Sequence, residues 1–187
     1  SLSDDGSIVA ISAPKNIGEG RRGGHVRVFK NKDGNWTQIG SDIDGNNMND
    51  HGGGVHKTSI VLSGDGTHLA VGTPFNNYWT MNNRYRGEVR IFKNENGTWN
   101  KVGADIHGEA GGTTSGDYSG KSIAISKDGS IIAIGAPGND EKGNNRGHVR
   151  VYKRDVVHHL GWVQIGSDID NLNQNSHDSF GSYVSLS

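Results

Sequence analysis

Residues 126–137 read SKDGSIIAIGAP, and two close copies stand earlier in the chain, SDDGSIVAISAP at residues 3–14 and SGDGTHLAVGTP at residues 63–74. Each copy is followed by a run of alternating apolar and polar residues, such as GHVRVYK in the last unit, and then by a tryptophan. These tryptophans are spaced by 63 residues: Trp36, Trp99 and Trp162. A period of about 60 residues indicates one supersecondary unit that is copied along the chain and buries its apolar faces against its neighbours.

The composition is typical of short elements joined by many turns. The 187 residues include 30 glycines, and only 31% are hydrophobic, gathered in runs such as HVRVF and EVRIF. This clustering favours β-strands and argues against disorder. The net charge of −1 predicts no general attraction to nucleic acid, and no apolar stretch has the length of a membrane span. The absence of cysteine excludes disulfides but does not fix the compartment.

The third unit shows the expected strands most clearly. Asp128-Gly129 supplies the positive φ that a hairpin turn requires, and Pro137 ends a strand because proline cannot donate to a continuing ladder. Val149 and Val151 alternate with polar residues, which is the period of a strand. We expect four strands, at residues 120–126, 130–135, 147–153 and 162–169.

Four antiparallel strands per unit, repeated in tandem, predict an all-β protein built of β-propeller blades. A β-sandwich and a β-solenoid are the alternatives. They are less favoured because solenoid coils are shorter and sandwich strands need not recur in near-identical copies. We interpret the chain as a single repeat array, with repeats at residues 1–60, 61–123 and 124–184 and the start of a next blade at 185–187. Closed propellers have about four or more blades, so we expect further blades in the same chain or a homo-oligomer.

The two halves of the FG-GAP repeat, the blade unit of integrin α-subunit propellers and related extracellular proteins, resemble segments of this chain. The second half corresponds to Gly135-Ala136-Pro137, with related tripeptides at residues 12–14 and 72–74. The first half corresponds to Phe180-Gly181, and decays to Ser119-Gly120 and to His56-Lys57 in the earlier junctions. The whole string from GSDID to RGHVRVYK is similar to the bacterial and algal branch of the family. The resemblance implies an extracellular or cell-surface propeller with a role in adhesion or protein binding.

Integrin-type blades carry a calcium loop of the form DxDxDG between their first two strands, and this chain departs from that pattern. Residues 3–6, 63–66 and 126–129 hold one or two carboxylates each, whereas calcium takes about six to eight oxygen ligands. We therefore expect no cofactor, and no calcium at these turns.

The remaining candidates for a metal are paired carboxylates after the fourth strand: Asp42, Asp44, Asp168 and Asp170. Alternate carboxylates before Gly or Asn resemble part of an oxygen cage for Ca²⁺. The alternative is a solvated loop whose aspartates cap a turn. The second unit weakens the metal interpretation, because His107 replaces one carboxylate.

The loop between the second and third strands is longest in the second unit and is rich in aromatic and arginine side chains. Such residues are enriched at recognition surfaces and stack on sugar rings. The alternative is that Trp79 covers a blade edge. The candidate ligand-binding or partner-binding residues are Tyr78, Trp79, Arg84, Tyr85 and Arg86.

Two N-glycosylation sequons begin at Asn35 and Asn96, both in the hairpin before the fourth strand. In a secreted glycoprotein they would be accessible acceptors, although an Asn-rich chain produces such matches by chance.

Signals for catalysis are weak. Residues 119–122 read SGKS, the tail of a phosphate loop, but a strand rather than a helix is expected to follow, and the histidines form no HExxH motif. We therefore expect a non-enzymatic surface module whose partner is a protein or a glycan, with no nucleic acid and no membrane insertion. The alternative function is a carbohydrate-binding, lectin-like propeller that holds sugars with aromatic loop residues.

Overall fold

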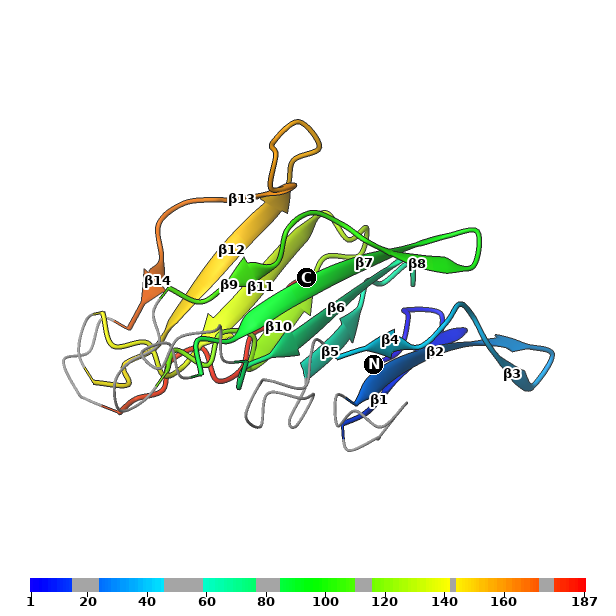
Figure 1. The fold of residues 1–187 in the computed structure, drawn as a ribbon, viewed down its shortest axis with the longest axis horizontal. Helices are drawn as coiled ribbons and strands as arrows, with labels where there is room; N and C mark the ends of the chain where they lie inside the picture. The colour runs from blue at the N-terminus through cyan, green and yellow to red at the C-terminus, as the bar shows by residue number, and fades with distance from the viewer. Residues whose placement is uncertain (15–23, 46–58, 77–84, 110–115, 142–143, 172–176) are drawn as a thin grey trace.

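The computed structural model describes residues 1–14, 24–45, 59–76, 85–109, 116–141, 144–171 and 177–187. These residues form three antiparallel sheets that follow one another along the chain (Figure 1). They contain strands and turns but no helix, so this part of the chain has no helical segment that could cross a membrane. The all-β class expected from the sequence is confirmed. The sheets are consistent with propeller blades, and the array they form is not a closed ring.

Each sheet repeats the same strand order. The first contains β1 (Ile8–Ala13), β2 (His25–Lys32), β3 (Asn35–Gln38) and β4 (Ile43–Asp44). The second contains β5 (Ser59–Leu62), β6 (His68–Thr73), β7 (Glu88–Glu95), β8 (Thr98–Lys101) and β9 (Ile106–His107). The third contains β10 (Ser122–Ile125), β11 (Ile131–Ala136), β12 (His148–Arg154), β13 (Trp162–Gln164) and β14 (Ile169–Asp170). The repeat limits expected at 60/61 and 123/124 fall inside β5 and β10, each of which pairs within the sheet that follows.

The outer strand of every sheet is interrupted, which corrects the expectation of one continuous strand over residues 162–169. β13 and β14 both pair with β12, as β3 and β4 both pair with β2. The interruption contains a glycine with positive φ in each unit, at 77° for Gly40, 74° for Gly103 and 74° for Gly166. Such a backbone conformation turns the chain out of the ladder before pairing resumes.

The innermost strand of the first sheet is reduced to a single bridge between Leu2 and Val9. In the other two sheets this position is occupied by the four-residue strands β5 and β10.

The expected Asp-Gly turns are confirmed, and each is held by its own aspartate. In the third unit, Asp128 Oδ1 accepts hydrogen bonds from Ser126 Oγ at 2.7 Å, Ser130 Oγ at 2.8 Å and Ser130 N at 3.0 Å. These bonds, the one from Ser126 above all, lower the pKa of Asp128 from 3.8 to about 2. Asp5 and Asp65 repeat the arrangement with the hydroxyl residues on either side of them.

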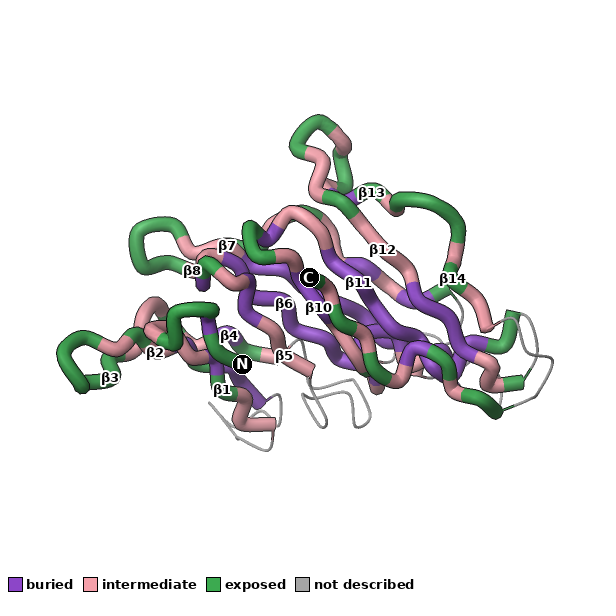
Figure 2. The backbone as a smooth tube through the Cα atoms, turned by 180° about the vertical axis from the view of Figure 1, so that it is seen from behind, coloured by how far each residue is buried: buried purple, intermediate pink, exposed green. Residues whose placement is uncertain are grey.

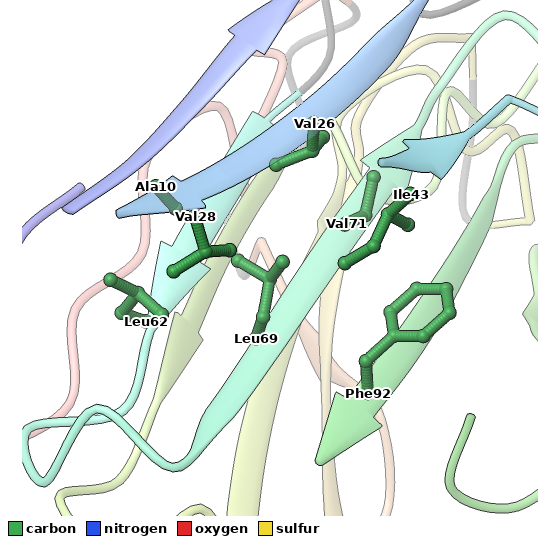
Figure 3. Close-up of a cluster of buried hydrophobic side chains, with 8 residues drawn as sticks. All are labelled: Ala10, Val26, Val28, Ile43, Leu62, Leu69, Val71 and Phe92. Atoms are coloured by element: carbon green, nitrogen blue, oxygen red, sulfur yellow. The ribbon is translucent and has the colours of Figure 1, made fainter. Parts of the chain in front are cut away.

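Apolar side chains fill the space between successive sheets. Val26 and Val28 of β2 pack with Leu69 and Val71 of β6 and Phe92 of β7 (Figure 3). A second cluster joins the second and third sheets in the same way, with Val89 and Ile91 on one side and Ile132 and Ile134 on the other. As Figure 2 shows, burial is most continuous along β6 and β11, while the β2–β3 and β7–β8 hairpins are exposed.

The two halves of the resembled repeat meet through their glycines. A Cβ on Gly135 would lie 2.0 Å from the carbonyl oxygen of Gly181, and one on Gly72 would lie 2.2 Å from that of Gly120. Any side chain there would overlap backbone, so only glycine allows this approach.

A tryptophan joins the second sheet to the first, and another joins the third sheet to the second. Trp99 donates its indole N–H to the carbonyl of Ile39 at 3.1 Å, and Trp162 donates to the carbonyl of Val102 at 3.0 Å. A Cβ on Gly40 or Gly103 would lie 2.8 Å from the corresponding indole ring, so glycine is required beneath the tryptophan as well as in the turn. We call this contact the tryptophan junction.

We expect Trp162→Phe to lower the free energy of unfolding by about 1–3 kcal/mol, because it leaves the Val102 carbonyl without its donor and removes buried ring volume. Trp162 is only 4% exposed. Trp36→Phe is the matched control and should change stability by less than about 0.5 kcal/mol, since Trp36 is 47% exposed. Urea unfolding measures both, and equal losses in the two variants would contradict the junction.

Candidate functional site

Of the four aspartates predicted as metal ligands, Asp42 and Asp168 lie at the interruptions of the outer strands and bind arginine, whereas Asp44 and Asp170 lie in β4 and β14. In the first unit, Arg27 Nε and Nη2 donate to the two carboxylate oxygens of Asp42, both at 2.8 Å, and Gln38 Nε2 adds a bond of 2.9 Å. His25 Nδ1 lies 3.6 Å from the same carboxylate. The hydrogen bond from Arg27, opposed by partial burial, lowers the pKa of Asp42 from 3.8 to about 2.

The third unit repeats this arrangement closely. Arg150 Nε and Nη2 donate to Asp168 at 2.9 and 2.8 Å, Gln164 Nε2 donates at 2.7 Å, and His148 Nδ1 lies 3.5 Å away. A bidentate arginine–carboxylate pair is among the stronger polar contacts in proteins. Both aspartates therefore have a structural role in bracing the interrupted strand.

The second unit keeps the aspartate and the arginine at these positions but gives them different partners. Asp105 pairs with Lys101 Nζ at 2.7 Å, and the buried Glu88 lies 3.9 Å from Arg90 Nε. Glu88 takes the place of the histidine that begins β2 and β12, and His107 takes the place of the second aspartate. The strand registers place these residues opposite one another in every sheet: His25 with Asp44, Glu88 with His107, and His148 with Asp170.

These contacts give Asp42 and Asp168 a partner that the spacing of the acidic pairs did not predict. Each of the two engages an arginine on the neighbouring strand. A signal for this was present, because an arginine stands two residues after the start of β2, β7 and β12 in all three units. Calcium binding by Asp42, Asp44, Asp168 and Asp170 stays a prediction.

Of the aromatic loop, Tyr78, Trp79 and Arg84 lie outside the described residues. Tyr85 stacks on Tyr118 with ring centroids 5.7 Å apart, and Phe75 meets both rings edge-on at 5.6 and 5.3 Å. Arg86 donates to the backbone carbonyl of Gly108. Tyr85 and Arg86 thus anchor the end of this loop to the protein. The two sequon asparagines, Asn35 and Asn96, are exposed in their hairpins.

The two outer faces of the array carry complementary halves of the tryptophan junction. Within the described part of the chain, Trp36 has no acceptor for its indole N–H, although it occupies the position of Trp99 and Trp162. At the other face, no described atom lies within 4 Å of a Cβ on Gly166, although this glycine corresponds to Gly40 and Gly103.

The open face of the third sheet exposes several apolar side chains. Ile165 corresponds to the acceptors Ile39 and Val102, and it lines a surface groove together with Val163 and Val156. The exposed fractions of Val163, Ile165 and Ile169 are 38%, 45% and 49%. Exposed apolar patches of this kind mark interaction surfaces.

The exposure of the arginine side chain in each unit depends on whether another sheet lies in front of it. Arg90 donates to the Asp44 carbonyl of the first sheet at 3.1 Å, and Arg150 pairs with Glu109, which follows β9 of the second sheet. Their side chains are 6% and 15% exposed. Arg27, in front of which the structure describes no sheet, is 45% exposed.

Residues 109–152 match the family model of the FG-GAP repeat. The matched segment runs from the loop after β9 into β12 and includes Ser119-Gly120 and Gly135-Ala136-Pro137. This match confirms the resemblance to the FG-GAP repeat for residues 109–152. Comparison with curated proteins finds no match to the chain.

The pairing of Asp42 with Arg27 predicts a pH-dependent contribution to stability. Because the folded-state pKa of about 2 lies below the ordinary 3.8, the contribution is complete above about pH 4 and is lost as the pH falls toward 2. Arg27→Gln should raise the pKa of Asp42 toward 3.8, measured from the carboxyl ¹³C shift during a pH titration. Asp5 is the control, since its pKa of about 2 depends on Ser3 and Ser7. An unchanged pKa for Asp42 in the variant would contradict the pairing.

Proposed function

We propose that this chain, which contains an FG-GAP repeat at residues 109–152, is part of a non-enzymatic β-propeller-type interaction module at the outside of the cell. The bacterial or algal branch of the family suits its sequence best. The observation that carries the proposal is the pair of unfilled half-junctions at the two ends of the sheet array. Among the residues that the structure describes, Trp36 presents a donor without an acceptor, and Ile165 with Gly166 presents the acceptor side without a donor.

The partner that fits these faces is another blade of the same kind. The junctions between the first and second sheets, and between the second and third, already show which groups meet. A further blade, contributed by the same protein or by a second copy of this chain, would repeat that contact at each end. Head-to-tail contacts of this type build rings or extended arrays.

Several observations support a structural and binding role rather than catalysis. The best-defined polar side chains, Arg27 with Asp42 and Arg150 with Asp168, satisfy one another. The exposed positions of Asn35 and Asn96 suit glycosylation in a secreted protein.

A carbohydrate-binding function is the second candidate. It is favoured by the cluster of Phe75, Tyr85 and Tyr118, which anchors one end of the loop that contains Tyr78 and Trp79. Aromatic side chains such as those of Tyr78 and Trp79 stack on sugar rings.

For the leading proposal, we expect the chain to self-associate in sedimentation equilibrium, with a mass above the 20.0 kDa of one chain as concentration rises. Trp36→Ala should weaken the association by about tenfold or more, because tryptophan is a typical hot-spot residue. Lys32→Ala, in the same hairpin, is the matched control and should change little. A monomer at all concentrations would contradict association between copies.

For the second candidate, a glycan array gives the test. Saturable binding that is lost in Trp79→Ala and kept in Trp36→Ala would favour the lectin function. Binding that is unaffected by Trp79→Ala, or no binding to any glycan, would remove it.

A further inference from the structure

Four side chains that can bind a metal meet where the second sheet contacts the third. Glu109 follows β9 of the second sheet, Glu141 follows β11, His148 begins β12, and Asp168 lies in the interruption between β13 and β14. One ligand atom from each lies within 4.8 Å of the others. We call these residues the junction cluster. The four residues lie in four separate segments of the chain and do not form a sequence motif.

His148 is the member that points to a ligand. Its side chain is 2% exposed, and its Nδ1 atom is buried without a hydrogen-bond partner among the described residues. The nearest opposite charge is Asp168 Oδ2 at 3.5 Å, beyond a good hydrogen bond. A buried imidazole nitrogen without a partner costs about 1–3 kcal/mol, so a native protein normally supplies one.

The charge of the junction cluster also favours a cation. Arg150 binds both Asp168 and Glu109, but it is one guanidinium among three carboxylates. The cluster itself therefore contains more carboxylates than guanidinium groups, and this balance favours a cation. Each carboxylate has about four lone-pair sites, so those that accept from Arg150, Gln164 and Asn139 still have capacity for a metal.

The distances between the ligand atoms are close to those around a bound zinc ion, so binding would require only small movements of the side chains. Ligand atoms around a tetrahedral zinc ion, with bonds of about 2.1 Å, lie about 3.4 Å apart. His148 Nδ1 and Asp168 Oδ2 are already 3.5 Å apart. Glu109 and Glu141 are exposed, so bringing their carboxylates the remaining distance to an ion displaces no packed core.

The other two units lack this combination. In the described part of the first unit, His25 and Asp42 lie 3.6 Å apart without a carboxylate group that completes a set of three or more. In the second unit, Glu88, Asp105 and His107 form a set of three, but Lys101 and Arg90 supply two positive charges to its two carboxylates.

We propose that the chain binds one divalent transition-metal ion in the junction cluster, through His148 Nδ1 and the carboxylates of Asp168, Glu109 and Glu141. An imidazole nitrogen with carboxylate oxygens suits zinc or a similar first-row ion, whereas calcium and magnesium prefer all-oxygen sites. The ion would join the second sheet to the third, because Glu109 belongs to one and the other three ligands belong to the other. This site is distinct from the Asp-Gly turns and does not include Asp170.

The test uses Zn²⁺ and Co²⁺ with chelator-treated protein. The half-buried His158 and the exposed His159, whose rings lie 4.5 Å apart, offer a competing surface site, so both are first replaced by alanine. In this background, we expect calorimetry to give one Zn²⁺ per chain. Co²⁺ should give the visible absorption of a low-coordinate nitrogen and oxygen site.

Glu109→Gln and Glu141→Gln, each in that background, should weaken Zn²⁺ binding by about tenfold or more. The metal-free thermal midpoint is measured for each variant, because Glu109→Gln also removes the ion pair with Arg150. His25→Ala is the matched control and should leave binding unchanged. The proposal is overturned if the background protein binds no Zn²⁺, if the double Glu109→Gln, Glu141→Gln variant binds as tightly, or if binding follows His25.

Discussion

The hydrogen bond from an indole N–H to a backbone carbonyl 60 residues earlier, made by Trp99 and again by Trp162, sets how successive sheets are placed. The donor stands at the start of an outer strand, and the acceptor stands at the end of the corresponding strand in the preceding sheet. A ring as large as indole fits there only because the residue after each acceptor is glycine. The same glycine has positive φ and interrupts the outer strand. The same glycine therefore leaves space for the tryptophan ring of the next sheet and also turns the backbone of its own strand.

That interruption creates the polar arrangement at the strand ends. It holds Asp42 and Asp168 beside an arginine of the middle strand, and it brings the short strands β4, β9 and β14 opposite the first residue of β2, β7 and β12. Across the three units the facing pair is His–Asp, Glu–His and His–Asp. Every unit therefore has one imidazole facing one carboxylate. In the second unit the two groups are exchanged, so that the carboxylate lies on the long strand β7 and the imidazole on the short strand β9. A cross-strand pair depends on complementarity, which either order provides.

Much of the fold could be predicted from the sequence because its determinants are local. Asp-Gly turns, proline stops and period-two alternation act over a few residues, and the positions of β11 and β12 follow from them. The interruption of the outer strand was missed because Gly166 looks like an ordinary strand glycine until its φ is known. The arginine pairs were missed for a different reason, since Arg27 and Asp42 are fifteen residues apart and meet only through strand register. The junction cluster forms only where two sheets are in contact, so no pattern in the sequence predicts it.

The exchange rates of the individual indole N–H protons test the role of the tryptophan junction most directly. They can be measured by hydrogen–deuterium exchange in solution NMR, at a dilution where the chain is monomeric. The indole protons of Trp99 and Trp162 should be protected, because each is bound to a carbonyl of the preceding sheet, while that of Trp36 should exchange as freely as an exposed indole. Equally fast exchange at all three positions would contradict the claim that this hydrogen bond holds the sheets together.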